Sequence, residues 1–210
     1  MGITKLDAAK HQLITAIRLF FEDRDPIAVT SLAGNASEIV DTLCKNKGHL
    51  RTVDEILRRF PNVNEKYIRS LKHHDRNFFK HADRNSEMSL DNYDEDFNDF
   101  LIMTAVQDLF ALTKTVPIEI QVFQIWCIAA HPEKLNPDTS EETFSKIEEM
   151  FPDFSDLSRR QKKLKGLSIL LHAKKSPSVI GDTSTDRTKV DDWPETILLG
   201  VKAVKELPPI

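Results

Sequence analysis

Residues 4–48 of the chain read TKLDAAKHQLITAIRLFFEDRDPIAVTSLAGNASEIVDTLCKNKG, and this stretch predicts two helices joined by a short link. Thr4 is a favourable N-cap and Asp7 follows it by three residues, so each side chain can accept a hydrogen bond from a free backbone N–H. Apolar side chains then recur with the helical period, at Leu6, Leu13, Ile17 and Phe20. The first helix is therefore expected to end near Asp23.

The second helix of this stretch is expected to begin at Asp25 and Pro26, since aspartate caps a helix and proline fits its first turn. Its apolar side chains are Leu32, Ala36, Ile39, Val40 and Leu43. Gly48 suits the left-handed residue that ends many helices. Because the link between the two helices is short, they are expected to lie antiparallel as a helical hairpin.

The same signals predict helices along the rest of the chain. They are expected over residues 52–60, 64–83, 96–113, 118–130, 141–151 and 157–174, and in a last segment that Trp193 and Pro194 open. With 6 glycines and 10 prolines in 210 residues, chain breakers are too sparse for many short strands. The predicted fold is all-α: an antiparallel helical bundle over residues 1–115, a helical extension over 116–175 packed on it, and a loop plus a short C-terminal helix over 176–210.

Two of these segments need a closer look. Thr52 and Glu55 have the spacing of a capping box and are expected to open the helix over 52–60. Residues 118–130 are apolar nearly all round, as in a central helix, but the first of them alternate between apolar and polar as a strand does. Both interpretations of residues 118–130 stay open at this point.

Composition restricts the class of protein. Hydrophobic residues make up 40% and charged residues 30%, which is typical of a soluble globular chain. The net charge of −4 excludes a generic polyanion binder, so any site for nucleic acid must be local. Cys44 and Cys127 are isolated, as reduced thiols in a cytoplasmic protein are. The most apolar window, residues 120–130, is too short to span a bilayer, so no membrane association is expected.

Residues 73–83, HHDRNFFKHAD, carry the densest chemistry in the chain, with three histidines, an arginine and a lysine. On a helical wheel from Glu65 to Asp83, an apolar arc is expected to face the core, made of Tyr67, Ile68, Leu71, Phe78, Phe79 and Ala82. A continuous basic stripe is expected on the opposite side, made of Lys66, Arg69, Lys72, Arg76 and Lys80, with His73 within it. Such a stripe suits an anionic ligand, and a solvated helix face is the alternative.

The segment Arg76-Asn77-Phe78-Phe79-Lys80-His81 resembles the R-x4-6-H motif of the HEPN-domain family, including the polar residue that often follows the arginine. The resemblance covers the first half of the chain, up to about Thr115. It implies a small all-α bundle, a homodimer, and in many members a metal-independent ribonuclease that acts as a toxin or in defence. Arg69 and His74 have the same spacing, but Ser70 follows that arginine.

The chemistry of RNA cleavage explains why these residue types would be needed. Attack by the 2′-hydroxyl requires a base, an acid for the leaving oxygen, and stabilisation of charge on phosphorus. The resemblance assigns catalysis to Arg76, His81 and Asn77: His81 as base or acid, Arg76 on the phosphate oxygens, and Asn77 orienting the ring of His81 or binding substrate. One His81 serves only one side of the phosphorus, so a two-fold dimer would supply the other.

Five further basic side chains of this helix are predicted to bind the RNA backbone: His73, His74, Lys72, Lys80 and Arg69. For the two histidines, a solvated pair is the alternative. A metal site built from His74, His81 and Asp83 is disfavoured because no familiar metal-ligand spacing is present, so neither a metal nor a cofactor is expected. Asp75 falls in the apolar arc and is expected to pair with a neighbouring helix, with Arg18 as one candidate partner; a role in aligning the site is the alternative.

The leading hypothesis is therefore a metal-independent endoribonuclease of HEPN type, a cytoplasmic homodimer acting on single-stranded RNA as a toxin or defence effector. An antitoxin or another protein partner would accompany such a role. The alternative is a non-catalytic helical bundle that uses the same helix to bind nucleotide, RNA or a protein.

Overall fold

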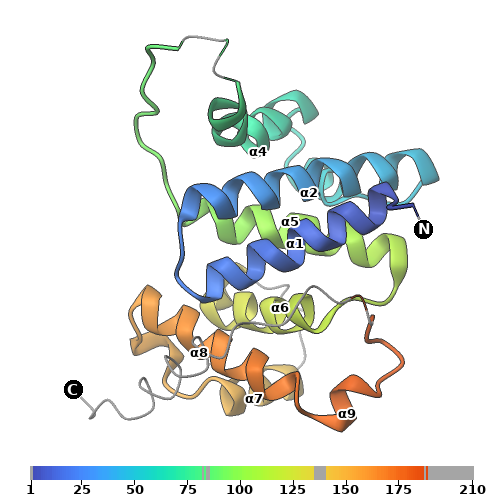
Figure 1. The fold of residues 1–210 in the computed structure, drawn as a ribbon, viewed down its shortest axis with the longest axis vertical. Helices are drawn as coiled ribbons and strands as arrows, with labels where there is room; N and C mark the ends of the chain where they lie inside the picture. Colours follow the sequence, from blue (N-terminus) through green and yellow to red (C-terminus); the bar gives the residue numbers. More distant parts are fainter. Residues whose placement is uncertain (1, 82, 84–85, 135–140, 187, 189–210) are drawn as a thin grey trace.

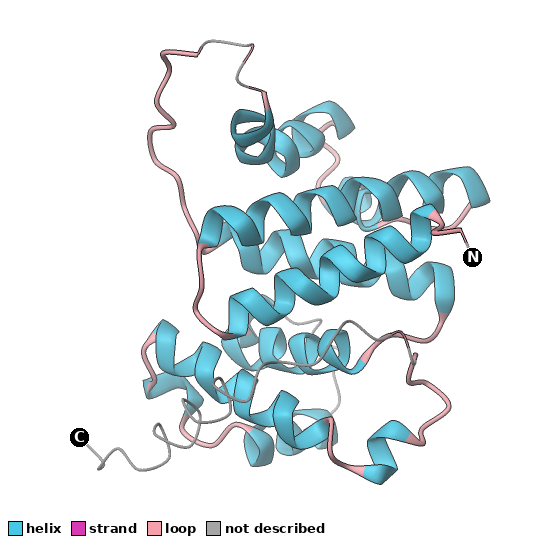
Figure 2. Cartoon of the chain, in the orientation of Figure 1, coloured by secondary structure: helices cyan, strands magenta, loops and turns pink. Residues whose placement is uncertain are grey.

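The computed structural model describes residues 2–81, 83, 86–134, 141–186 and 188. This part of the chain is helical without a β-strand (Figure 2), which confirms the all-α fold class. The α-helices are α1 (Lys5–Phe21), α2 (Pro26–Lys47), α3 (Thr52–Arg59), α4 (Glu65–Lys80), α5 (Phe97–Thr113), α6 (Ile118–Ala130), α7 (Glu141–Met150), α8 (Arg159–Ala173) and α9 (Pro177–Ile180). Two short 3-10 turns are η1 (Pro132–Lys134) and η2 (Phe154–Asp156). None of the described helices combines the length and the apolar character needed to cross a membrane.

The ends of α1 and α2 follow the sequence signals. The Thr4 hydroxyl accepts the backbone N–H of Asp7 at 3.1 Å, and the Asp7 carboxylate accepts that of Thr4 at 3.0 Å. Asp25 caps α2, and Gly48 ends it in the left-handed region with φ of 71°. Both helices therefore begin and end where local backbone chemistry places them.

The start of α3 differs from its prediction. Arg51 is the N-cap residue, and its backbone N–H donates to the Asp54 carboxylate at 3.0 Å. Thr52 instead donates both its backbone N–H and its hydroxyl to Asp108 on α5, at 2.7 and 2.8 Å. The capping box expected from Thr52 and Glu55 is wrong because a carboxylate distant in sequence takes these bonds.

Helix α2 packs on both α1 and α5, α4 packs on its other side, and α6 and α8 lie beyond α1 (Figure 1). Aromatic rings fill the junction of α1 and α6: the ring centroids of Phe20 and Trp126 are 4.9 Å apart, and those of Phe20 and Phe123 are 5.4 Å apart. Phe123 and Trp126 are buried in a regular helix, so the strand interpretation of residues 118–130 is excluded.

Helix α8 belongs to the same hydrophobic core. A Cβ atom at Gly166 would lie 2.4 Å from Cε1 of Phe21, so only glycine lets α8 approach α1 this closely. Leu167 and Leu170 of α8 are buried in one cluster with residues of α1, α2, α5 and α6. The core thus continues across residue 115, while the division of the chain at 115 and 175 stays a prediction.

The predicted orientation of α4 is wrong for most of its apolar arc, although Ile68 of that arc is buried as expected. The face that packs toward α2 carries Ile68, Lys72 and Arg76, which are 4%, 3% and 6% exposed. Three other residues expected inward instead reach solvent, with 55% of Tyr67, 45% of Leu71 and 37% of Phe78 exposed. Acids on α2 and α5 attract the cations of α4 inward. Ala82 lies outside the described residues.

The C-terminal predictions are tested in part. Helix α9 falls inside the segment expected to be a loop, so that prediction is wrong for these few residues. Beyond it, Val116 and Thr185 form an isolated backbone bridge, and Lys10 of α1 pairs with Asp186. The last helix, expected to open at Trp193, lies outside the described residues.

Candidate functional site on α2 and α4

Arg76 is the most deeply buried of the residues predicted to be catalytic. Its guanidinium reaches from α4 to α2, where Nη1 pairs with the Glu38 carboxylate and lies 3.5 Å from the Gly34 carbonyl oxygen. Nη2 donates to Oδ1 of Asn77 at 2.9 Å. Because a guanidinium donates in several directions within one plane, Arg76 links the two helices at this point.

Gly34 makes this approach possible. A Cβ atom at position 34 would lie 2.9 Å from Cδ of Arg76, and 3.3 Å from its Cβ and Cγ. These separations are shorter than the optimum for carbon–carbon contact, so any side chain at position 34 would push the arginine away from α2. Glycine inside a helix is about 1 kcal/mol less favourable than alanine, and here the close packing of Arg76 offsets that cost.

His73 and Glu38 flank the guanidinium. Burial, and then the charge of Arg76, lowers the pKa of His73 to about 4, so its ring is neutral near pH 7. Nδ1 of His73 and Nε of Arg76 are both buried, and neither has a hydrogen-bond partner among the described residues. The Glu38 side chain is 52% exposed, and the hydrogen bond from Arg76 lowers the pKa of its carboxyl. Arg76, His73 and Glu38 therefore form one compact polar cluster, which we call the Arg76 group.

Asn77 and His81 lie at the end of α4. The Asn77 side chain contacts the Arg76 guanidinium, and its backbone carbonyl accepts the N–H of His81 at 3.1 Å. His81 is the C-cap residue of α4; its side chain is 34% exposed, with Nδ1 3.7 Å from the Asp83 carboxylate. Among the described residues no hydrogen bond joins the His81 ring to Arg76 or Asn77. Asn77 thus orients the arginine, while His81 remains open to solvent.

Lys72 and Arg69, both predicted to bind substrate, lie in a different ionic network. Arg69 pairs with Asp41 at 3.0 Å and with Glu65 at 2.9 Å. Burial lowers the pKa of Lys72, which the charges of Asp108 and Asp41 partly counteract. The continuous basic stripe is therefore not formed, because acids of α2, α4 and α5 neutralise these cations.

The other predicted residues are at the surface. His74 is exposed, and its Nδ1 lies 2.8 Å from the Asp75 carboxylate. The expected pairing of Asp75 with Arg18 is wrong, since Arg18 pairs with Glu119 on α6 at 2.8 Å. Lys80 is exposed on the last turn of α4, and its charge contributes to the low pKa of Glu38. Of these surface residues, Lys80 is the one that influences the Arg76 group.

Glu38 and Gly34 were missed because sequence inspection compared residues only within one helix. A signal was present, since Gly34 interrupts the middle of a helix one turn before an acid. Glycine inside a helix often marks close contact with another element. That signal indicates a contact, but the partner on α4 follows only from the fold.

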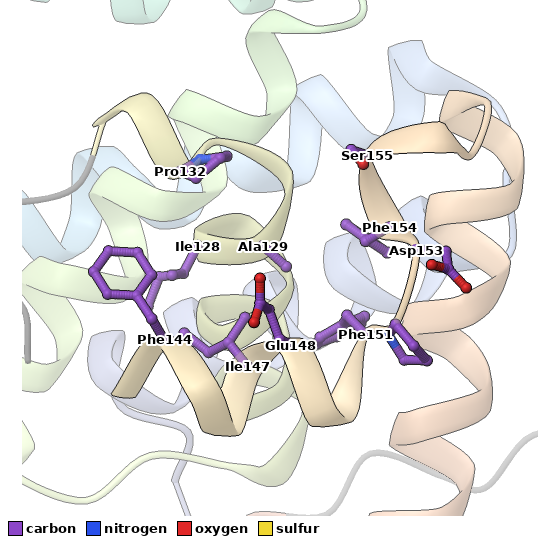
Figure 3. Close-up of a pocket in the computed structure, with 11 residues that line it drawn as sticks. Ile128, Ala129, Pro132, Phe144, Ile147, Glu148, Phe151, Asp153, Phe154 and Ser155 are labelled. Carbon is purple, nitrogen blue, oxygen red and sulfur yellow. The ribbon is translucent and has the colours of Figure 1, made fainter. Parts of the chain in front are cut away.

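A cavity lies away from this group, between α6, η1, α7 and η2 (Figure 3). Its volume is about 470 Å³. Apolar side chains such as Ile128, Phe144 and Phe151 line it, with Glu148 and Asp153 as the ionisable residues. The residues predicted to be catalytic or substrate-binding are not among those that line it. In the described part of the chain, no three or more His, Cys, Asp or Glu side chains are grouped to hold a metal ion.

In comparisons with known proteins, no family model, no curated protein and no solved structure matches this chain.

Proposed function

We propose that the chain is a metal-independent endoribonuclease of HEPN type, which cleaves single-stranded RNA by attack of the RNA's own 2′-hydroxyl. The observation that carries this proposal is the placement of Arg76. Its stem is fixed against Gly34 and its Nη2 is held by Asn77, while its acidic partner Glu38 is reached by solvent. Stabilising the charge of the phosphorane requires a guanidinium that is already held in place and that the substrate can reach.

His81 would supply proton transfer. Its ring lies at the C-terminal end of α4 and is partly exposed, so a ribose hydroxyl or leaving oxygen can reach it. Histidine is the side chain best suited to exchange protons near neutral pH. Asn77, one turn before His81, contributes by holding the arginine and not the histidine ring.

A homodimer would complete the site. The outer face of α4 carries Tyr67, Leu71 and Phe78, each more than a third exposed and close to one line along the helix. Exposed apolar side chains in a row suit a protein contact better than water. Two copies joined here would place one His81 from each on the shared substrate, in a cytoplasmic toxin or defence effector with an antitoxin as partner.

A non-catalytic binding module is the second candidate, and one observation favours it. Arg76 is 6% exposed and its charge is already neutralised by Glu38, as in a structural clamp between helices. Such a protein would bind RNA, nucleotide or another protein without breaking a phosphodiester bond.

Incubation with end-labelled single-stranded RNA, with and without EDTA, separates these functions. The proposal expects cleavage that persists in EDTA, products ending in a 2′,3′-cyclic phosphate, and no cleavage of 2′-O-methyl RNA, which lacks the nucleophile. Binding of both RNAs without cleavage of either would support the binding module. Cleavage abolished by EDTA would contradict the metal-independent mechanism.

A further inference from the structure

The ion pair of Arg76 and Glu38 is asymmetric. The arginine side chain is 7% exposed and the glutamate side chain is 52% exposed. A carboxylate that only neutralised a buried arginine could be equally buried. An exposed carboxylate loses little free energy when it moves into water, because exposed ion pairs are worth about 1 kcal/mol or less. Glu38 is therefore the replaceable partner of a fixed cation.

The guanidinium would keep its position if Glu38 left. Gly34 allows the stem of Arg76 to lie against α2, and Asn77 accepts from Nη2 on the α4 side. Two buried nitrogens of the Arg76 group, Nε of Arg76 and Nδ1 of His73, have no hydrogen-bond partner within the part of the chain that the structure describes. Buried polar atoms without partners are uncommon, and a missing acceptor or donor is one explanation for them.

The chemistry of the group points to an oxyanion. Carboxylate and phosphate oxygens both match the planar fork of arginine. The hydrogen bond from Arg76 and the charges of Arg76 and Lys80 lower the pKa of Glu38, and the same two charges would attract a phosphate at this position.

We propose that Arg76 and His73 form a binding site for a phosphate of RNA on α2 and α4, and that the Glu38 carboxylate occupies this site until the phosphate displaces it. The choice of RNA as ligand rests on the proposed function. Glu38 is then a competitor of the substrate and not a residue that helps to bind it.

Binding of a fluorescein-labelled 2′-O-methyl RNA, followed by anisotropy, tests this inference without cleavage. Glu38→Gln keeps the shape of the side chain and removes its charge, so the affinity is expected to rise about threefold. Glu149→Gln on the exposed face of α7 removes the same charge elsewhere and is expected to leave affinity nearly unchanged. Arg76→Lys is expected to weaken binding about fivefold or more, and to abolish the gain from Glu38→Gln in the double variant.

Weaker binding by Glu38→Gln would overturn the inference, because Glu38 would then serve only to hold Arg76. An unchanged affinity, a gain equal to that of Glu149→Gln, a gain that persists in the Arg76→Lys background, or no binding by any variant would overturn it too. If Glu38→Gln melts early, Glu38→Asp, which keeps the charge but shortens its reach, replaces it with the same expected gain. Absence of cleavage of unmodified RNA, with these affinities as expected, would contradict the proposed function alone.

Discussion

At the contact of α2 and α4, Cδ of Arg76 lies 2.9 Å from the position that a Cβ atom of residue 34 would take. Helix propensity taken alone predicts that alanine at position 34 stabilises α2 by about 1 kcal/mol. The contact with Arg76 predicts the opposite, that alanine at position 34 destabilises the fold. The same contact explains why Arg76, predicted to lie on an open basic face, is a packing residue as well as a candidate catalytic one.

Gly34→Ala is expected to destabilise the fold by about 1–3 kcal/mol, because the new methyl group displaces the Arg76 stem. Urea unfolding of Gly34→Ala, Arg76→Ala and the double variant measures the coupling. In the Arg76→Ala background, the cost of alanine at position 34 should largely disappear. Equal costs in both backgrounds would show that the glycine serves a different neighbour.

His73 predicts a pH dependence of stability. Its pKa is about 4 in the folded chain because of burial and the nearby Arg76, against about 6.5 when unfolded. Between these values the unfolded chain binds a proton that the folded chain does not. Stability should therefore fall as the pH drops from 6.5 toward 4. This loss is on the order of 1 kcal/mol, allowing for the partial exposure of the ring.

The measurement is the melting temperature between pH 7.5 and 4.5. His73→Gln should flatten the profile relative to the wild type, and His172→Gln, at an exposed position of α8, should not. Superimposable profiles of the wild type and His73→Gln would contradict the assignment.

At the scale of the helices, the sequence largely predicted where each helix begins and ends, but it predicted less well which side of a helix is buried. Caps such as Thr4 and Asp25 act through neighbouring backbone groups, so local sequence contains the information. Which side of α4 is buried depends on Glu38, Asp41 and Asp108, which lie on other helices. A helical wheel shows the side chains of one helix only, so it cannot reveal acidic partners on other helices. The motif of the candidate site was visible in the sequence, but its counter-charge was not.

Substitutions on α4 test both which side of this helix is buried and whether its exposed side forms the proposed dimer. Leu71→Glu is expected to fold, since the leucine is 45% exposed, and to shift the mass from dimer to monomer in light scattering. Ile68→Glu, at a position that is 4% exposed, should unfold the chain, because it buries an unpaired charge. If Leu71→Glu also unfolds, Leu71 belongs to the core; a dimer that persists would use another face.

Across the whole molecule, the two halves of the chain share one core. Arg18 of α1 pairs with Glu119 of α6 at 2.8 Å, and Lys163 of α8 pairs with Asp23 at 2.9 Å. The sequence predicted helices in both halves, yet the close fit of α8 on Phe21 depends on a contact between distant residues. That kind of fit follows from packing in three dimensions and not from local periodicity.

Gly166→Ala tests this shared core. Its methyl group would lie 2.4 Å from Phe21 and 2.9 Å from Trp126, so the variant should lose about 1–3 kcal/mol in chemical unfolding. Ser168→Ala on the same helix is expected to stay within about 0.5 kcal/mol of the wild type. A Gly166→Ala variant as stable as Ser168→Ala would show that α8 does not pack closely on α1.

The central claim, RNA cleavage by Arg76 and His81, is tested most directly at His81. Arg76→Ala is a poorer choice, because it removes a buried side chain that packs on Gly34 and should also destabilise the fold. His81 is the partly exposed C-cap of α4, so His81→Ala should remain folded. In EDTA, His81→Ala is expected to cleave single-stranded RNA about 10²–10⁴ times more slowly than the wild type, with His172→Ala unaffected. A folded His81→Ala variant that cleaves as fast as the wild type would contradict the claim.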